Sequence, residues 1–154
     1  MPTVFTMILK GELPARFVWK DATCVAFLSI APLRPGHALV VPQVEVDHWI
    51  DLDAATMDHL TAVARDIGKA QMHAFGPAKV GLMIAGLEVR HVHLHVVPID
   101  DVKDLDFARQ DPHATAVDLD AAAERIRSSL AALGLGPAAP GPADSGPRPS
   151  APGA

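Results

Sequence analysis

Residues 91–98, His-Val-His-Leu-His-Val-Val-Pro, decide the fold, because histidines and apolar residues alternate there with a period of two. Side chains of a β-strand point alternately to opposite faces, so this period predicts a strand over His91–Val97. The side chains of Val92, Leu94 and Val96 are expected to enter a core, and the three histidines share the other face. The sequence therefore predicts a row of imidazoles held on rigid backbone.

Such a row suits two chemistries. A neutral imidazole can attack phosphorus with one ring nitrogen while a carbonyl holds the other, and neighbouring histidines can bind phosphoryl oxygens. Histidines can also bind a metal, but Cα atoms of His91 and His95 would lie about 13 Å apart along a strand. With metal–nitrogen bonds of about 2.0–2.1 Å, the three histidines could not all reach one ion, so a metal would need two of the histidines and a ligand from elsewhere in the chain. A purely structural role is the third alternative, and the residues alone leave all three open.

The pattern around this stretch predicts an α+β fold with a mostly antiparallel five-stranded sheet and two helices. Asp53 is a predicted N-cap for a helix that ends near Phe75, because Gly76-Pro77 is a strong stop signal. A second helix carries its apolar residues from Leu119 to Leu133 at helical spacing. Besides the histidine strand, the predicted strands are Phe17–Lys20, Cys24–Ile30, His37–Pro42 and Val80–Ala85.

The C-terminal segment differs in composition from the rest of the chain. Residues 136–154 contain 6 Pro, 4 Gly, 5 Ala and 2 Ser in 19 positions, with no apolar period. Such a segment buries too little surface to offset the entropy lost on ordering, so we predict a disordered tail. The folded domain is predicted to span residues 2–135.

Composition excludes several functional classes. The chain has 154 residues and a net charge of -5, which argues against a nucleic-acid partner, since such partners are held by basic patches. No apolar run approaches the roughly 18 residues that span a bilayer, and the N-terminus does not read as a signal peptide, so no membrane partner is expected. Cys24 is the only cysteine. We therefore expect a cytoplasmic protein without an intrachain disulfide.

The stretch at residues 91–97 resembles the motif of the histidine triad (HIT) superfamily of nucleotide hydrolases and transferases, in which histidines alternate with apolar residues. The resemblance extends to Pro35-Gly36-His37 and to Ala85-Gly86 ahead of the triad. It covers about residues 3–100. Further matching segments are Phe5…Ile8, Gly11-Glu12-Leu13-Pro14 and Ala26-Phe27-Leu28.

The resemblance implies a role for each histidine. His93 would be the nucleophile that forms a covalent nucleotidyl-histidine intermediate, and His95 would contact the phosphoryl oxygens or the leaving group. His91 would orient the site, and His37 would support the triad. The resemblance also implies a homodimer, a nucleotide-like small-molecule substrate, and catalysis that needs neither a metal nor another cofactor.

Four positions depart from the family pattern. Thr3 and Thr6 stand where many bacterial members have the cysteines of a structural zinc site, so no metal site is expected. Ser29 stands where an Asp or Asn commonly binds the ribose hydroxyls. Gly86 is followed by Leu87 in place of a glutamine whose amide can bond the scissile phosphate region. We therefore expect Ser29, Gly86 and Leu87 to contact the substrate with altered recognition.

These observations predict a histidine triad hydrolase, or a transferase, acting on a nucleoside phosphate ester, anhydride or phosphoramidate. A non-catalytic nucleotide-binding module and a metal-dependent hydrolase are the alternatives. The remaining histidines have no partner spacing and are predicted to lie on the surface; they are His48, His59, His73 and His113. Trp19 and Trp49 are expected to pack in a core or interface rather than stack on a base.

Overall fold

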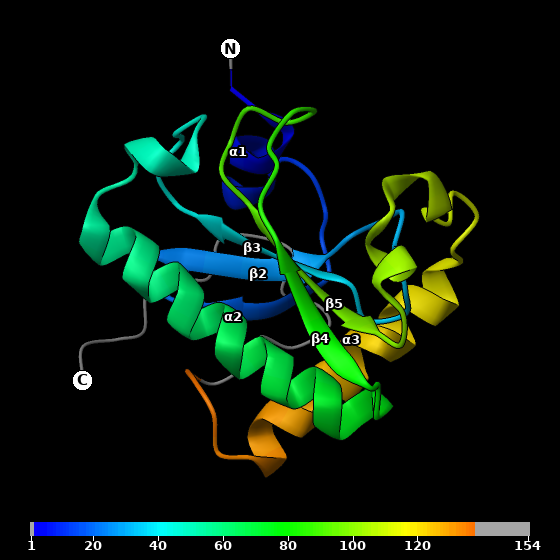
Figure 1. Cartoon of the computed structure of the whole chain (residues 1–154). Coiled ribbons are helices and arrows are strands. Elements are labelled where there is room, and N and C mark those ends of the chain that lie inside the picture. Colours follow the sequence, from blue (N-terminus) through cyan, green and yellow to red (C-terminus); the bar gives the residue numbers. More distant parts are fainter. Residues whose placement is uncertain (1, 138–154) are drawn as a thin grey trace.

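A computed structural model describes residues 2–137 and contains a five-stranded antiparallel sheet with the strand order β1-β2-β3-β5-β4 (Figure 1). The predicted α+β class with a five-stranded antiparallel sheet is confirmed. The predicted tail, apart from Gly136 and Pro137, lies outside the described residues. The strands are β1 (Phe17–Lys20), β2 (Cys24–Leu28), β3 (Ala38–Pro42), β4 (Lys79–Met83) and β5 (Leu94–Ile99).

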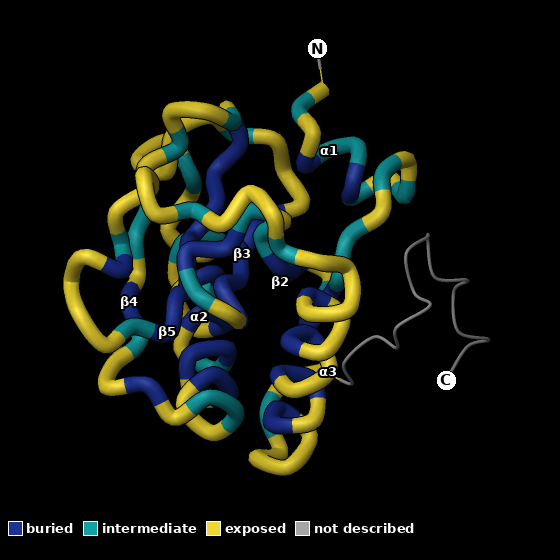
Figure 2. The backbone as a smooth tube through the Cα atoms, turned by 90° about the vertical axis from the view of Figure 1, so that its right-hand side faces the viewer, coloured by how far each residue is buried: buried dark blue, intermediate teal, exposed yellow. Residues whose placement is uncertain are grey.

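Two long helices, α2 (Ala54–Phe75) and α3 (Ala116–Ala132), form where the apolar periods predict them. Asp53 caps α2 by accepting a hydrogen bond from the backbone N–H of Thr56, and Gly76 ends it in the left-handed conformation at φ 60°. The two helices pack on the same face of the sheet, where their apolar side chains and alternate strand residues form the main core. Figure 2 shows buried positions along both helices and along the strands.

The structure contains a third α-helix, α1 (Val4–Leu9), whereas the sequence predicted only two helices. It is six residues long, too short for a helical period to stand out, and it begins where Thr3 caps the backbone N–H of Thr6. Its buried side chains, Phe5 and Ile8, pack on the other face of the sheet against apolar residues of β1, β2 and β3. This smaller core lies on the face that carries the histidines.

The strand predicted over His91–Val97 is also corrected, since β5 begins only at Leu94. His91 and His93 belong to the segment that leads into the strand. The alternation of faces nevertheless extends through this segment, because Val92, Leu94 and Val96 are all buried in the main core. No helix in the described residues has the length and apolar character required to cross a membrane.

Candidate active site

Four histidines converge on the α1 face of the sheet. The ring centroids of His93 and His95 lie 4.8 Å apart, and that of His37, which directly precedes β3, lies 5.1 Å from His95. His91 packs beside Phe5 of α1, with ring centroids 5.9 Å apart. All four histidines are buried, with exposed fractions of 7% or less.

The hydrogen-bond partner of His93 determines which ring nitrogen carries its hydrogen. Its Nδ1 lies 2.7 Å from the carbonyl oxygen of His91. A carbonyl only accepts, so Nδ1 must donate, and the unshared electron pair of the neutral ring is then on Nε2. His93 lines the cavity described below. Its geometry is therefore that of a neutral nucleophile held by its own backbone.

His95 is assigned the opposite polarity by a relay that begins in the backbone. The N–H of Leu33 donates to Nδ1 of His37 at 3.0 Å, so the hydrogen of the His37 ring is on Nε2. That nitrogen lies 2.9 Å from Nδ1 of His95 and donates to it. The hydrogen of the His95 ring is consequently on Nε2, so His95 can donate a hydrogen bond to a ligand.

His91 fastens the site to two other parts of the fold. Its Nε2 donates to the carbonyl oxygen of Pro42 at 2.9 Å, and its Nδ1 accepts from the hydroxyl of Thr3 at 3.0 Å. Thr6 donates to Oε1 of Glu45 at 2.6 Å. The two threonines that replace the cysteines of the family pattern thus tie α1 to the histidines and to Glu45.

Burial lowers the pKa of each of these histidines below the ordinary value of 6.5, because the charged ring loses its hydration. With the repulsion of neighbouring histidines added, the pKa of His37 falls to about 3 and that of His95 to about 4. The pKa of His93 is also lowered by burial, against the hydrogen bond to His91 that raises it. The rings are therefore neutral at pH 7, and the electron pair on His93 is available.

A cavity of about 900 Å³ opens over His93 and His95. Its walls are mainly apolar, from Phe5 and Ile8 of α1 and Phe27 and Leu39 of the sheet. A size and lining of this kind suit a small organic ligand oriented by a few polar groups.

The three positions expected to contact substrate, Ser29, Gly86 and Leu87, also line this cavity. Ser29 follows β2, and its hydroxyl accepts from the backbone N–H of Ala31 at 3.3 Å. Gly86 adopts φ 74°, in the left-handed region, within the loop that leads to the triad. Leu87 is 90% exposed at the mouth.

Residues outside the histidine motif also line the cavity, and no sequence pattern predicted this. Phe107 packs edge to face against His95, with ring centroids 5.1 Å apart. Arg16 pairs with Asp120 of α3 at 2.6 Å, and both line the cavity. The C-terminal helix therefore contributes to the site as well as to the core.

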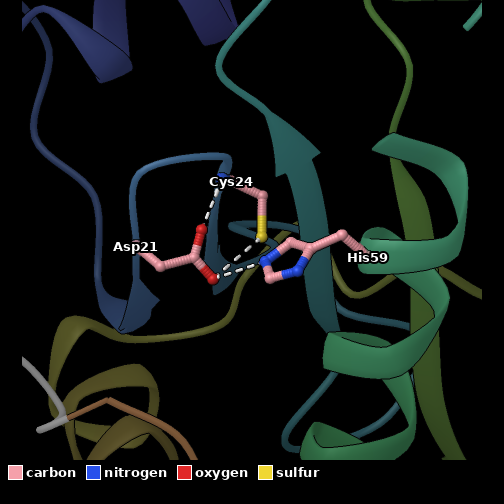
Figure 3. A group of neighbouring side chains, drawn as sticks. All are labelled: Asp21, Cys24 and His59. Atoms are coloured by element: carbon pink, nitrogen blue, oxygen red, sulfur yellow. Dashed lines mark hydrogen bonds and ion pairs between the residues drawn. The ribbon is translucent and has the colours of Figure 1, made fainter. Parts of the chain in front are cut away.

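A second polar cluster lies where α2 passes the β1–β2 turn (Figure 3). Asp21 accepts from Nε2 of His59 at 2.7 Å and from the indole of Trp19 at 2.8 Å, and Sγ of Cys24 is 3.7 Å away. The sequence predicted that His59 lies on the surface without a partner. In the structure it is partly covered and bound to Asp21. Trp19 is buried in the main core, which confirms its predicted packing role.

Comparisons with known proteins identify the family to which the chain is similar. Residues 10–102 match the HIT domain family. An uncharacterised HIT-like protein of Methanocaldococcus jannaschii is 31% identical over 99 residues, covering 62% of this chain and 77% of its own. The adenosine 5′-monophosphoramidase of Schizosaccharomyces pombe is 31% identical over 103 residues, covering 64% and 74%.

Solved structures of histidine triad proteins have a similar fold. A zinc-bound histidine triad family protein of Mycobacterium smegmatis superposes with a TM-score of 0.74 at 26% identity, over 85% of this chain and 94% of that one. A HIT-like protein of Bartonella henselae, involved in cell-cycle regulation, superposes with a TM-score of 0.73 at 26% identity, over 83% of this chain and 96% of that one. With the four histidines in place and the match covering more than half of its length, the chain belongs to the HIT domain family.

Proposed function

We propose that this chain hydrolyses nucleotidyl phosphorus bonds through a covalent intermediate on His93. The observation that carries the proposal is the pair of opposite ring polarities at the cavity. An electron pair on Nε2 of His93 lies beside an N–H on Nε2 of His95, and backbone groups hold both tautomers. A nucleophile and an adjacent hydrogen-bond donor are the two groups that attack at an anionic phosphorus requires.

The reaction then proceeds in two displacements. Nε2 of His93 forms a bond to phosphorus while the bond to the leaving group breaks, and His95 donates a hydrogen bond to a non-bridging phosphoryl oxygen. Water next attacks phosphorus and breaks the phosphorus–nitrogen bond, which returns the electron pair to His93. One water is consumed over both steps, its hydroxyl going to phosphorus and its proton to the leaving group.

The substrate class follows from the cavity and from the family. Apolar walls from α1 and the sheet can accommodate a nucleoside. One relative is named as an adenosine 5′-monophosphoramidase. We therefore propose a nucleoside phosphoramidate, ester or anhydride as substrate. An acceptor other than water in the second step would make the enzyme a transferase.

The test is direct detection of the intermediate. Purified protein is mixed with adenosine 5′-phosphoramidate, quenched and digested, and the peptide that contains His93 is examined for an added adenylyl group by mass spectrometry. We expect this adduct together with release of AMP. Nucleotide binding without turnover would instead show a non-catalytic module, and turnover abolished by a chelator and restored by a divalent ion would show a metal-dependent hydrolase.

We further propose that two copies of the chain associate along β4, in line with the homodimer expected from the family resemblance. The strand lies at the edge of the sheet, so one side of its backbone is unpaired within the described chain. Leu82 on this strand is 52% exposed. Light scattering should give about twice the chain mass, and Leu82→Glu should lower it. The cytoplasmic location stays a prediction from the sequence.

A further inference from the structure

Gln71 of α2 makes an unusual connection to the two strands that carry the histidine relay. Its side chain is fully buried, and its Nε2 donates to the carbonyl oxygens of Gly36 at 2.9 Å and Val96 at 2.8 Å. Both partners can only accept, so the amide nitrogen must face them and the orientation of the amide is determined. One side chain thereby joins the start of β3 to the middle of β5.

The position of this connection follows from the sheet. In the β3–β5 pairing Ala38 is opposite Val96, and continuing the register by two residues places Gly36 opposite Pro98. Proline has no N–H to donate, so the ladder cannot supply a hydrogen to the Gly36 carbonyl. Gln71 supplies it from the neighbouring helix.

The two carbonyls that Gln71 binds are adjacent in sequence to the two rings of the relay. Gly36 precedes His37, and Val96 follows His95, while the rings themselves are joined at 2.9 Å. The Gly36 turn, at φ 88°, is also packed against α2, since a Cβ placed there would lie 2.4 Å from the ring of Phe75. Helix α2 therefore holds the backbone of the turn from which His37 projects.

We propose that Gln71 is a positioning residue for catalysis, which keeps His37 and His95 in hydrogen-bond register and so keeps the N–H of His95 directed at the cavity. The inference rests on the proposed function. Gln71 does not line the cavity, and its effect on substrate passes through the relay. Displacing a catalytic group by about 1 Å can reduce a rate about 10²-fold, so a distant amide can have a large effect.

The experiment compares Gln71→Met with Val63→Ala in the full chain. Methionine keeps the length of the side chain and removes both donors, whereas Val63, also buried on α2, lies in the core and its truncation destabilises the fold without touching the relay. Gln71→Asn is the milder companion, because it retains the amide but shortens its reach.

We expect Gln71→Met to lower kcat for adenosine 5′-phosphoramidate by about 10- to 100-fold with KM changed less than about twofold, because the apolar walls lie on the other sheet face. The acid limb of the kcat–pH profile should move to higher pH, because burial lowers the pKa of His95 and a displaced ring is less well desolvated. Gln71→Asn should fall between Gln71→Met and the parent in both readouts. Val63→Ala should change melting temperature only.

The proposal is overturned if kcat and the acid limb of Gln71→Met match those of the parent, or if Val63→Ala changes both equally. Should Gln71→Met fail to fold, the same two readouts on Gln71→Asn decide. A parent with no turnover defeats the proposed function instead. In that case the ¹⁵N spectrum of His95 still tests the positioning role. A hydrogen bond to His37 that is present in the parent and lost in the Gln71 variants would support this role, and identical spectra in parent and variants would refute it.

Discussion

Two polar clusters in this fold contain histidine, and they differ in what their hydrogen-bonding groups face. Around Asp21, the carboxylate accepts from His59, from the indole of Trp19 and from the backbone N–H groups of Thr23 and Cys24. Burial raises the pKa of Asp21, but these four donors outweigh it and bring the pKa to about 2. In Figure 3 the hydrogen bonds from His59 and Cys24 converge on this one carboxylate.

The triad cluster is arranged the other way. His91 and His37 use both ring nitrogens for contacts within the protein. His93 and His95 use only Nδ1, and their second nitrogen remains at a cavity of about 900 Å³. A group of titratable residues is therefore a candidate site where some of its hydrogen-bonding atoms have no partner in the protein and face open volume. The Asp21 cluster instead fastens the β1–β2 turn to α2.

The largest expected difference between the clusters is in catalysis. His93→Ala should lower kcat about 10³-fold or more, because the covalent route is removed, which is far more than the loss of its buried hydrogen bond to His91 would cause through stability. His59→Ala should instead leave kcat within twofold, with a melting temperature lower by about 2–4 °C for a lost hydrogen bond worth about 1 kcal/mol. Steady-state kinetics and thermal unfolding of both variants check this. Activity of His93→Ala within tenfold of the parent would contradict the covalent mechanism.

The next largest effect concerns the hydrogen-bonding groups that the cavity offers to a substrate. Leu87 cannot donate to a phosphoryl oxygen, and Ser29 offers one hydroxyl where a carboxylate could accept from two ribose hydroxyls. Leu87→Gln and Ser29→Asp should each raise kcat/KM on an adenosine phosphoramidate about tenfold. Asp21→Glu is the control in the other cluster and should not change it. A parent that gains from neither change would show that the cavity is built for a different leaving group.

The two clusters should also differ, by a smaller amount, in how pH changes their contribution to the free energy of unfolding. The histidines have folded pKa values below the unfolded 6.5, so the unfolded chain binds more protons and the free energy of unfolding falls as pH drops from about 6.5 toward 4. Asp21, with a folded pKa of about 2 against 3.8, contributes stability that is complete above pH 4. The melting temperature should drop by at least about 5 °C between pH 7 and 5.

His37→Gln should reduce this pH-dependent drop, because the group with the most strongly lowered pKa is removed. Asp21→Asn should lower the melting temperature by the same amount at pH 7 and pH 5. Calorimetry of the two variants at both values measures the difference. An Asp21→Asn loss that vanishes at pH 5 would mean that the carboxylate titrates in this range, against the pKa given above.

The smallest expected effect is that of metal removal. Oxygen and nitrogen atoms of Asp21 and His59 lie with Sγ of Cys24 within 4.8 Å of one another, which is ligand spacing. The thiol is fully buried, however, and burial raises its pKa well above the ordinary value, so the thiolate needed for a metal is disfavoured. Dialysis against a strong chelator should leave both turnover and melting temperature unchanged. Loss of turnover would favour a metal at the histidines, and loss of stability alone a metal at Asp21.

Much of the architecture could be read from local patterns. The period-two alternation assigned Val92, Leu94 and Val96 to the core correctly, even though the strand begins only at Leu94. Helix α2 ends where Gly76 predicts, because a left-handed residue is a local requirement. Helix α1 escaped prediction, since six residues are stabilised by the packing of Phe5 and Ile8 on the sheet rather than by their own propensity.

The residues that share one face of the backbone can be recognised from the sequence alone, because side-chain direction repeats within a few residues of any strand or helix. The chemistry of the histidine rings, in contrast, depends on contacts made in the folded protein. His37 and His95 are 58 positions apart, and His91 meets Thr3 across 88. Which nitrogen carries a hydrogen depends on such partners, and Gln71 reaches its two carbonyls only after α2 has packed on the sheet. Contacts between distant segments exist only once the chain has folded, so no local pattern can specify them.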